Sequence, residues 1–256
     1  MVQSLNRALD VLEALAAGSD DVGISQITAR TGLPLGTVHR LLRSLVARGY
    51  AAQDLETRLY GPGPRLLEVA ARASASRRFS LSRIARPALL GLTTATGETS
   101  NLLVLNGDEA VYSEQVASPH LVRMFTEVGQ RVPLYCIGGG KAMLAGFADD
   151  QLEAYLDRTT LCAFTPKTKA TAESLRHELT GVREQGFAID DEEREVGVCC
   201  IAAPIFDRLG RCVAALSISG PTTRMSRERA LGLGPLVHEA AATCSIQLGF
   251  HPAESG

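Results

Sequence analysis

The sequence predicts an α+β protein made of two parts joined by a helix. Residues 1–64 hold three helical patterns followed by two short strand-like runs, residues 65–80 return to a helical pattern, and residues 81–250 mix strands with helices. The chain has 256 residues, enough for two modest domains that each bury a core. Apolar residues make up 45% of it and charged residues 21%, as in an ordinary globular protein.

The first three helices follow one another closely. Apolar residues recur with a helical period from Leu5 to Ala17. Ser25 is the expected N-cap of a short helix over residues 26–30, and Gly32 supplies the tight turn before the next helix. This order predicts a helix-turn-helix.

The helix after Gly32 has two contrasting sides. Its apolar stripe recurs at i, i+3, i+4, i+7 and i+8, and consists of Val38, Leu41, Leu42, Leu45 and Val46. The opposite side carries small residues, threonine and arginine, which suit a DNA groove because they let the backbone approach and supply donors to phosphates and base edges. An ordinary amphipathic helix with a solvated polar side is the alternative.

A short hairpin follows this helix. Residues 50–53 and 58–60 are strand-like and flank a polar turn, Asp54 to Thr57. Three helices followed by a hairpin predict a winged helix-turn-helix, in which Arg58 of the wing would contact DNA unless it is merely solvated. The candidate DNA contacts are Gln26, Thr37, His39, Arg40, Arg43, Ser44 and Arg58.

The charge distribution supports the same division. Residues 1–78 hold ten Lys and Arg against seven Asp and Glu, whereas the remainder holds sixteen against twenty-one. A basic front part joined to an acidic back part is consistent with nucleic-acid binding at one end.

The C-terminal part predicts one sheet with helices at its sides. The expected strands cover residues 99–105, 110–116, 121–126, 198–206 and 211–218. The expected helices cover residues 82–95, 139–147, 149–156, 172–185 and 227–248.

Composition also predicts where the protein works and what it lacks. Six cysteines occur without a CxxC pair or an accompanying pair of histidines, so we expect free thiols and no structural zinc site. We also expect no other metal and no cofactor. No N-terminal secretory segment and no apolar stretch of membrane-spanning length is present, so we expect a cytoplasmic protein without a membrane partner.

A glycine-rich helix start is the first candidate for ligand binding. Gly138, Gly139, Gly140 and Lys141 open a predicted helix, where free N–H groups and the positive end of the helix dipole favour a carboxylate. A phosphate-binding P-loop is excluded, because it needs a further glycine five positions before the Gly-Lys pair and Ser or Thr after the lysine.

Two serines are the second candidate. Ser217 and Ser219 stand two apart on a predicted strand, so their hydroxyls share one face and could donate to one oxyanion. Alternate serines could equally face solvent. Leu216 and Ile218 suggest that the other face of this strand is buried.

Many motifs in one order resemble the IclR family of bacterial transcriptional regulators. In the N-terminal part they are Arg7-Ala8-Leu9-Asp10-Val11-Leu12, Thr31-Gly32-Leu33-Pro34 and Thr37-Val38-His39-Arg40-Leu41-Leu42. In the C-terminal part they are Val132-Pro133-Leu134, Gly140-Lys141-Ala142, Phe164-Thr165-Pro166, Asp190-Asp191-Glu192-Glu193, residues 197–204 and residues 216–221.

The resemblance implies a winged helix-turn-helix, a linker helix and a GAF-like effector-binding domain. It implies a homodimer or a dimer of dimers on a near-palindromic operator, and control of a catabolic operon by a small organic acid. We expect a repressor responding to a keto-, hydroxy- or aromatic acid, although activators share this layout.

The resemblance also implies an effector site. The positions that match the ligand-binding residues of the family are Gly138, Gly139, Asp190, Cys200, Ser217 and Ser219, and those that match its apolar wall are Leu121, Met124, Val132 and Val198. A carboxylate at Asp190 would repel an acid, so we expect it to accept from a ligand hydroxyl, a hydrated carbonyl or a backbone N–H. This favours a hydroxy- or keto-acid over a plain fatty acid.

Two other classes of function remain open from the sequence. The first is a hydrolase that would use Cys200 with His177 or His238 and Asp190, although nothing in the sequence places either histidine near that thiol. The second is a sensor whose partner is another protein, against which the arginine-bearing helix argues. We therefore expect no catalytic residue and no enzyme.

Overall fold

The computed structural model describes residues 3–17, 20–74 and 81–251, with the backbone alone for residues 70–74. The chain divides into two compact units, residues 1–78 and 79–256. Residues 75–80, the second part of the expected linker helix, lie outside the described residues. Within the described ranges, no helix has the length and apolar character needed to cross a bilayer.

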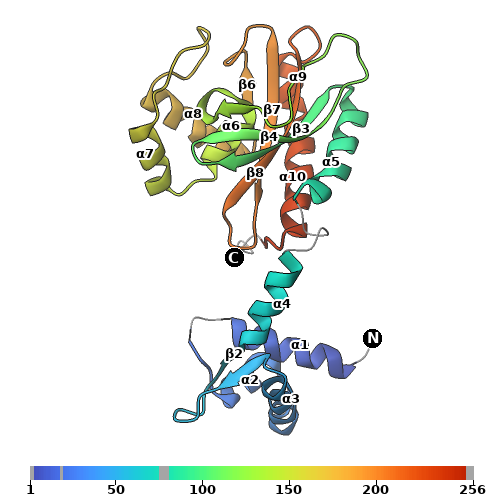
Figure 1. Ribbon diagram of the computed structural model, residues 1–256, viewed down its shortest axis with the longest axis vertical. Coiled ribbons are helices and arrows are strands. Elements are labelled where there is room, and N and C mark those ends of the chain that lie inside the picture. Colours follow the sequence, from blue (N-terminus) through green and yellow to red (C-terminus); the bar gives the residue numbers. More distant parts are fainter. Residues whose placement is uncertain (1–2, 18–19, 75–80, 252–256) are drawn as a thin grey trace. The chain divides into compact units, whose positions relative to one another are not determined.

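The N-terminal unit has the predicted element order (Figure 1). Its elements are α1 (Gln3–Ala16), α2 (Ile24–Thr31), α3 (Leu35–Ala47), β1 (Ala51–Gln53), β2 (Tyr60–Pro62) and α4 (Pro64–Ser74). The two strands pair antiparallel, with Ala51 opposite Pro62. The described part of this unit is therefore a winged helix-turn-helix.

The apolar stripe of α3 packs into the core of this unit. Val38, Leu42 and Leu45 are buried against residues of α1 and α2, and Leu41 is half-buried. Val46, predicted as the last member of the stripe, is 37% exposed because it lies at the C-terminal end of the helix, beyond the packed turns.

The cap of α2 differs from the prediction. Gly23 occupies the N-cap position and Ser25 lies inside the helix. The side chain of Gln26 replaces the expected serine cap, since its Oε1 accepts a hydrogen bond of 2.9 Å from the Gly23 N–H.

The C-terminal unit is a six-stranded antiparallel sheet flanked by helices. Its strands are β3 (Thr99–Asn106), β4 (Glu109–Val116), β5 (Arg131–Pro133), β6 (Ala188–Asp191), β7 (Val198–Phe206) and β8 (Cys212–Pro221), in the order β5-β4-β3-β8-β7-β6. Its helices are α5 (Leu81–Thr96), α6 (Gly138–Ala145), α7 (Asp149–Arg158), α8 (Ala172–Gln185), α9 (Arg227–Gly232) and α10 (Gly234–Gln247), with a short 3-10 turn at Leu134–Cys136.

Two predicted elements of this unit are corrected, and two of its strands were not predicted. Residues 121–126 form no strand, because the edge of β4 is taken by the segment that leads into β5: the Tyr112 N–H donates to the Gln130 carbonyl. The long final helix is two helices, because Pro235 at the start of α10 cannot continue a preceding helix. Strands β5 and β6 were not expected.

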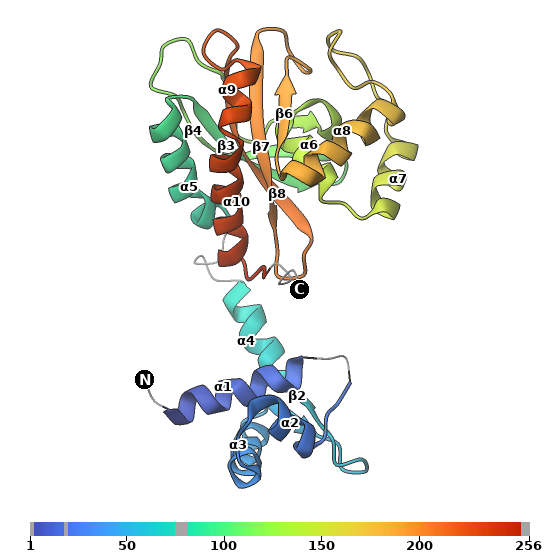
Figure 2. The ribbon, with the colours of Figure 1, turned by 180° about the vertical axis from the view of Figure 1, so that it is seen from behind.

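The sheet separates two layers of helices (Figures 1 and 2). Helices α6, α7 and α8 pack on one face around residues such as Leu103 and Ala215, and α5, α9 and α10 pack on the other around Leu216 and Ile218. Because side chains alternate along β8, Ser217 and Ser219 point to the face that α6 covers. The buried opposite face of this strand is confirmed.

Helix α6 lies unusually close to its neighbours, and glycine makes this possible. A Cβ on Gly140 would stand 2.1 Å from the Leu134 carbonyl oxygen, and one on Gly139 would stand 2.9 Å from Leu103 Cδ1. The first turn of α6 therefore lies directly against the sheet.

We expect Gly140→Ala to lower the free energy of unfolding of the C-terminal unit by about 1–3 kcal/mol or more, because the added methyl meets backbone rather than a movable side chain. Gly181→Ala in α8 is the matched control: nothing lies within 4 Å of its added Cβ, so it should be neutral or stabilise by about 0.5–1 kcal/mol. Urea titration followed by circular dichroism measures both. Equal stabilities of the two variants would contradict the close packing of α6.

Candidate functional site

The exposed side of α3 carries the predicted cations. Arg40 and Arg43 are exposed together with His39 and Ser44, and Thr37 is half-buried. Among the described residues neither arginine takes part in an ion pair. Ser44 donates its hydroxyl proton to the Arg40 carbonyl, 3.2 Å away, so that hydroxyl is already used within the helix.

The two candidates outside α3 are held by local hydrogen bonds. Gln26 uses its side-chain oxygen as the cap of α2, which leaves its amide N–H groups for other partners. Arg58 lies in the wing turn with φ at 62°, and the Asp54 carboxylate orders this turn by accepting from the N–H groups of Glu56 and Thr57. The side chain of Arg58 is exposed.

The C-terminal unit holds a cavity of about 140 Å³ beside the first turn of α6. Most of the predicted effector residues line it: Met124, Val132, Gly139, Asp190, Val198, Cys200, Ser217 and Ser219. The other lining residues are Leu103, Tyr112, Phe125, Thr126, Gln130, Ile137, Arg194 and Glu195. All six strands of the sheet and α6 thus contribute to one small site.

Two predicted effector residues lie elsewhere. Leu121 is 98% exposed and does not line the cavity, because the segment expected to be a strand is a surface loop. Gly138 lies behind the wall rather than in it: a Cβ there would stand 3.1 Å from Cys200 Sγ and 3.5 Å from the Asp190 backbone nitrogen.

Hydrogen-bond donors line the cavity at the start of α6 and on β8. Gly139 brings the start of α6 to it, where backbone N–H groups are unpaired and the helix dipole is positive. Asn101 is fully buried, and its side-chain N–H donates to Ser217 Oγ at 3.5 Å. A serine oxygen that accepts from Asn101 keeps its own proton for a ligand.

Asp190 is a buried carboxyl in the wall of this cavity. It lies on β6, is 3% exposed, and its Oδ1 accepts from the Glu193 N–H at 2.7 Å. Burial raises the pKa of Asp190 to about 7, despite hydrogen bonds from the backbone of Glu193 and Arg194 that favour the charged form. Near neutral pH this carboxyl can therefore be either a donor or an acceptor.

The cavity does not have the parts of a cysteine hydrolase. Burial raises the pKa of the Cys200 thiol to about 12, so it is protonated at neutral pH. His177 lies exposed on α8 and His238 lines a different cavity, so neither histidine is among the lining residues here. No described group of three or more His, Cys, Asp or Glu could hold a metal ion.

Sequence reasoning missed half of the lining residues. Thr126 is the last residue of a segment expected to be a strand, Gln130 lies beyond that segment, and Tyr112 points inward from a predicted strand. Arg194 directly follows the acidic run 190–193. A positive residue at the end of four negative ones was the only sequence feature that could have indicated it.

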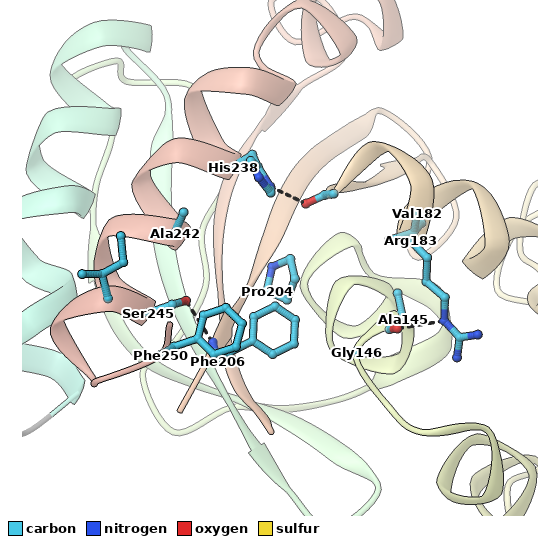
Figure 3. Close-up of a pocket in the computed structure, with 12 residues that line it drawn as sticks. Ala145, Gly146, Val182, Arg183, Pro204, Phe206, His238, Ala242, Ser245 and Phe250 are labelled. Carbon is cyan, nitrogen blue, oxygen red and sulfur yellow. Dashed lines mark hydrogen bonds between the residues drawn. The ribbon is translucent and has the colours of Figure 1, made fainter. Parts of the chain in front are cut away.

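A roomier cavity of about 350 Å³ lies between α8, α10 and β7 (Figure 3). Its polar groups are engaged with protein: His238 Nδ1 lies 3.1 Å from the Gly186 carbonyl, Arg183 Nε donates to the Ala145 carbonyl, and Ser245 Oγ accepts from the Phe206 N–H. Phe206 also stacks on Phe250. This cavity is mainly apolar and offers few donors to an anion.

Comparison with known proteins agrees with this architecture. Residues 4–55 match the model of the IclR helix-turn-helix domain, and residues 73–246 match that of the bacterial transcriptional regulator IclR C-terminal domain.

Two curated relatives match over almost the whole chain. The HTH-type transcriptional regulator BhcR of Paracoccus denitrificans is 38% identical over 96% of this chain and 87% of its own. The HTH-type transcriptional repressor AllR of Escherichia coli K12 is 37% identical over 98% of this chain and 92% of its own.

A solved structure has a similar fold over almost the whole chain. The crystal structure of a putative IclR transcriptional regulator from Silicibacter sp. TM1040 covers 99% of both chains with a TM-score of 0.81 at 27% identity. With both domain models matched in order and relatives above 30% identity across the chain, the protein belongs to the IclR family of transcriptional regulators.

Proposed function

We propose that this regulator is a repressor of a catabolic operon whose affinity for DNA is set by a small organic acid. The observation that carries the proposal is the cavity of the C-terminal unit, where the start of α6, two serine hydroxyls and a buried carboxyl converge. The acid would bind there, and α3 of the N-terminal unit would bind the operator.

The DNA-binding half of the proposal depends on the free cations of α3. Arg40 and Arg43 are exposed and unpaired among the described residues, and Gly36 and Ala47 on the same side let the helix approach a surface closely. Two copies would enter successive major grooves of a near-palindromic site. Thr37, His39, Ser44, Gln26 and Arg58 are the further proposed contacts.

A homodimer or a dimer of dimers would supply those two copies. Leu5 is 58% exposed and Leu9 is 47% exposed on α1, one turn apart on the same side of the helix. Apolar side chains exposed in this way support pairing of two N-terminal units.

The choice of ligand follows from the size and chemistry of the cavity. Its volume of about 140 Å³ is below the roughly 300–1,000 Å³ of sites for drug-sized ligands, which favours a short acid over an aromatic one. The carboxylate would accept from the N–H groups of α6 and from Ser217 and Ser219. Asp190 would donate to, or accept from, the hydroxyl or keto group of the acid.

Catalysis is not part of the proposal. A protonated Cys200 thiol without a neighbouring histidine supports binding of the acid rather than its hydrolysis. We also propose no metal and no cofactor.

A screen of short acids tests the proposal. Thermal shift should rise with one or more hydroxy- or keto-acids, since a ligand that binds only the folded state stabilises it. The same acid should change the affinity of the protein for DNA upstream of its own gene, measured by fluorescence anisotropy against random duplex. Preference for a simple alkanoate over every hydroxy- and keto-acid would contradict the assigned ligand class.

We expect Arg40→Ala to weaken specific DNA binding by about tenfold or more and to reduce its salt dependence if the lost contact is to phosphate. The affinity for the acid should stay unchanged. Arg208→Ala, which removes the same charge from an exposed turn of the C-terminal unit, is the control. Joint loss of DNA and acid binding in Arg40→Ala would indicate misfolding and would not support the contact.

Binding of the acid should also depend on pH through Asp190. Below about pH 7 the Asp190 carboxyl is neutral, so an anion binds without proton uptake. Above pH 7 the carboxylate would repel the anion, so binding of the acid is coupled to uptake of one proton by Asp190. We therefore expect the affinity to fall by up to about tenfold per pH unit above 7. Asp190→Asn, which imitates the neutral carboxyl, should bind without this slope. Calorimetry between pH 6 and 9 measures it, and a flat wild-type profile would refute the linkage.

A further inference from the structure

We infer that Arg194 determines the charge specificity of the cavity: its guanidinium, braced on the ring of Phe164, selects the anionic acid over uncharged analogues. The inference rests on the proposed function, because it concerns the same ligand. It assigns a recognition role to a residue outside the set that the sequence resemblance implied.

Arg194 is placed to act on a bound anion. It lines the cavity together with Gly139 and the two serines, and its side chain is half-buried at the turn after β6. Of the lining residues that the structure describes, it alone carries a positive charge. No ion pair between described residues includes it.

The guanidinium is held by an aromatic surface. Its central carbon stands 3.9 Å from the centre of the Phe164 ring, within the range of a cation–π contact. Phe164 in turn stacks on Tyr135, with ring centres 6.3 Å apart. The Tyr135 hydroxyl accepts from the Cys162 N–H at 2.9 Å and donates to the Cys162 carbonyl at 3.0 Å.

The segment that carries Phe164 is itself tied to the turn that carries Arg194. Thr165 Oγ1 donates to the Glu192 carbonyl at 2.7 Å, and Thr168 Oγ1 donates to the Glu193 carbonyl at 2.6 Å. Both partners of the cation–π contact are therefore fixed before a ligand arrives. A preorganised cation loses little entropy on binding an anion, which favours affinity.

Arg194 is the charged group that can favour an anion, because the carboxyl-bearing side chains of the lining are acidic. The remaining ionisable carboxyls in the lining are Asp190 and Glu195, and Glu195 is exposed. Without Arg194 no described side chain of the lining would carry a positive charge toward an anion. The field of Arg194 reaches the cavity wall, where it opposes the burial that raises the pKa of Tyr112.

Acid and amide pairs test this inference. Calorimetry would compare glycolate, lactate and 2-hydroxybutyrate, each beside its primary amide, with the full-length protein. The wild type should bind at least one acid about tenfold or more tightly than its amide. Arg194→Gln should lose about tenfold or more of the acid affinity and keep amide affinity within about twofold, since removing one partner of a close charge pair is costly.

Three variants separate charge from structure. Arg194→Lys keeps the charge without the planar stacking, so part of the acid preference should remain. Phe164→Leu removes the brace and should reduce the preference by a few fold. Arg208→Gln makes the same change of net charge on an exposed turn and should leave the preference unchanged.

The outcomes are distinguishable. Equal binding of acid and amide by the wild type, or an unchanged preference in Arg194→Gln, would overturn the role of Arg194 while leaving an acid-responsive regulator intact. An unchanged preference in Phe164→Leu would overturn the brace. If no acid binds at all, the proposed function falls, and this inference falls with it.

Discussion

A single buried ammonium group joins the segments that build the cavity. Lys141 on α6 is fully buried, and its Nζ donates to Glu178 of α8 at 2.8 Å, to the Ile189 carbonyl of β6 and to Glu193 of the following turn. Glu193 then donates its N–H to Asp190, so the charged core and the cavity wall are connected by one residue. This cation is thus a common anchor of α6, β6 and the acidic turn.

The buried Lys141 ammonium stays charged because Glu193 and Glu178 offset the cost of removing it from water. Burial lowers the pKa of Lys141, but the attraction of Glu193 and Glu178 outweighs burial and holds that pKa above its usual value. Such buried ion pairs add little net stability compared with apolar packing, whereas removal of one partner is strongly destabilising. The arrangement therefore specifies where the turn lies, and with it the positions of Asp190 and Arg194, more than it stabilises the fold.

The sequence predicted the helix-turn-helix and most strands, because their apolar periods are strong and local. Within the site, local chemistry alone pointed to Gly139 and the serines of β8, whereas the family resemblance added Asp190, Cys200 and the apolar wall. The burial of Asp190 shows what a local pattern does not reveal: this first residue of an acidic run lies on a buried strand. Glu193 of the same run pairs with Lys141, which lies far away in the sequence, and no local pattern in the run indicates such a partner. The prediction for Leu121 was wrong because a later segment, β5, pairs with the edge of β4. The strand-like residues around Leu121 therefore form no strand, and Leu121 is exposed.

The same geometry limits how the cavity can recognise an anion. A lysine directly after three glycines suggests a residue that would itself bind an anionic ligand, but Lys141 points into the core and its Nζ is occupied by three protein oxygens. The start of α6 therefore offers N–H groups and a dipole without a mobile cation. Neutral donors of this kind recognise the shape and lone pairs of a carboxylate, and they also accommodate an amide oxygen. Discrimination of the anion must then come from a charge elsewhere in the wall, and Arg194 is the described lining residue that can supply it.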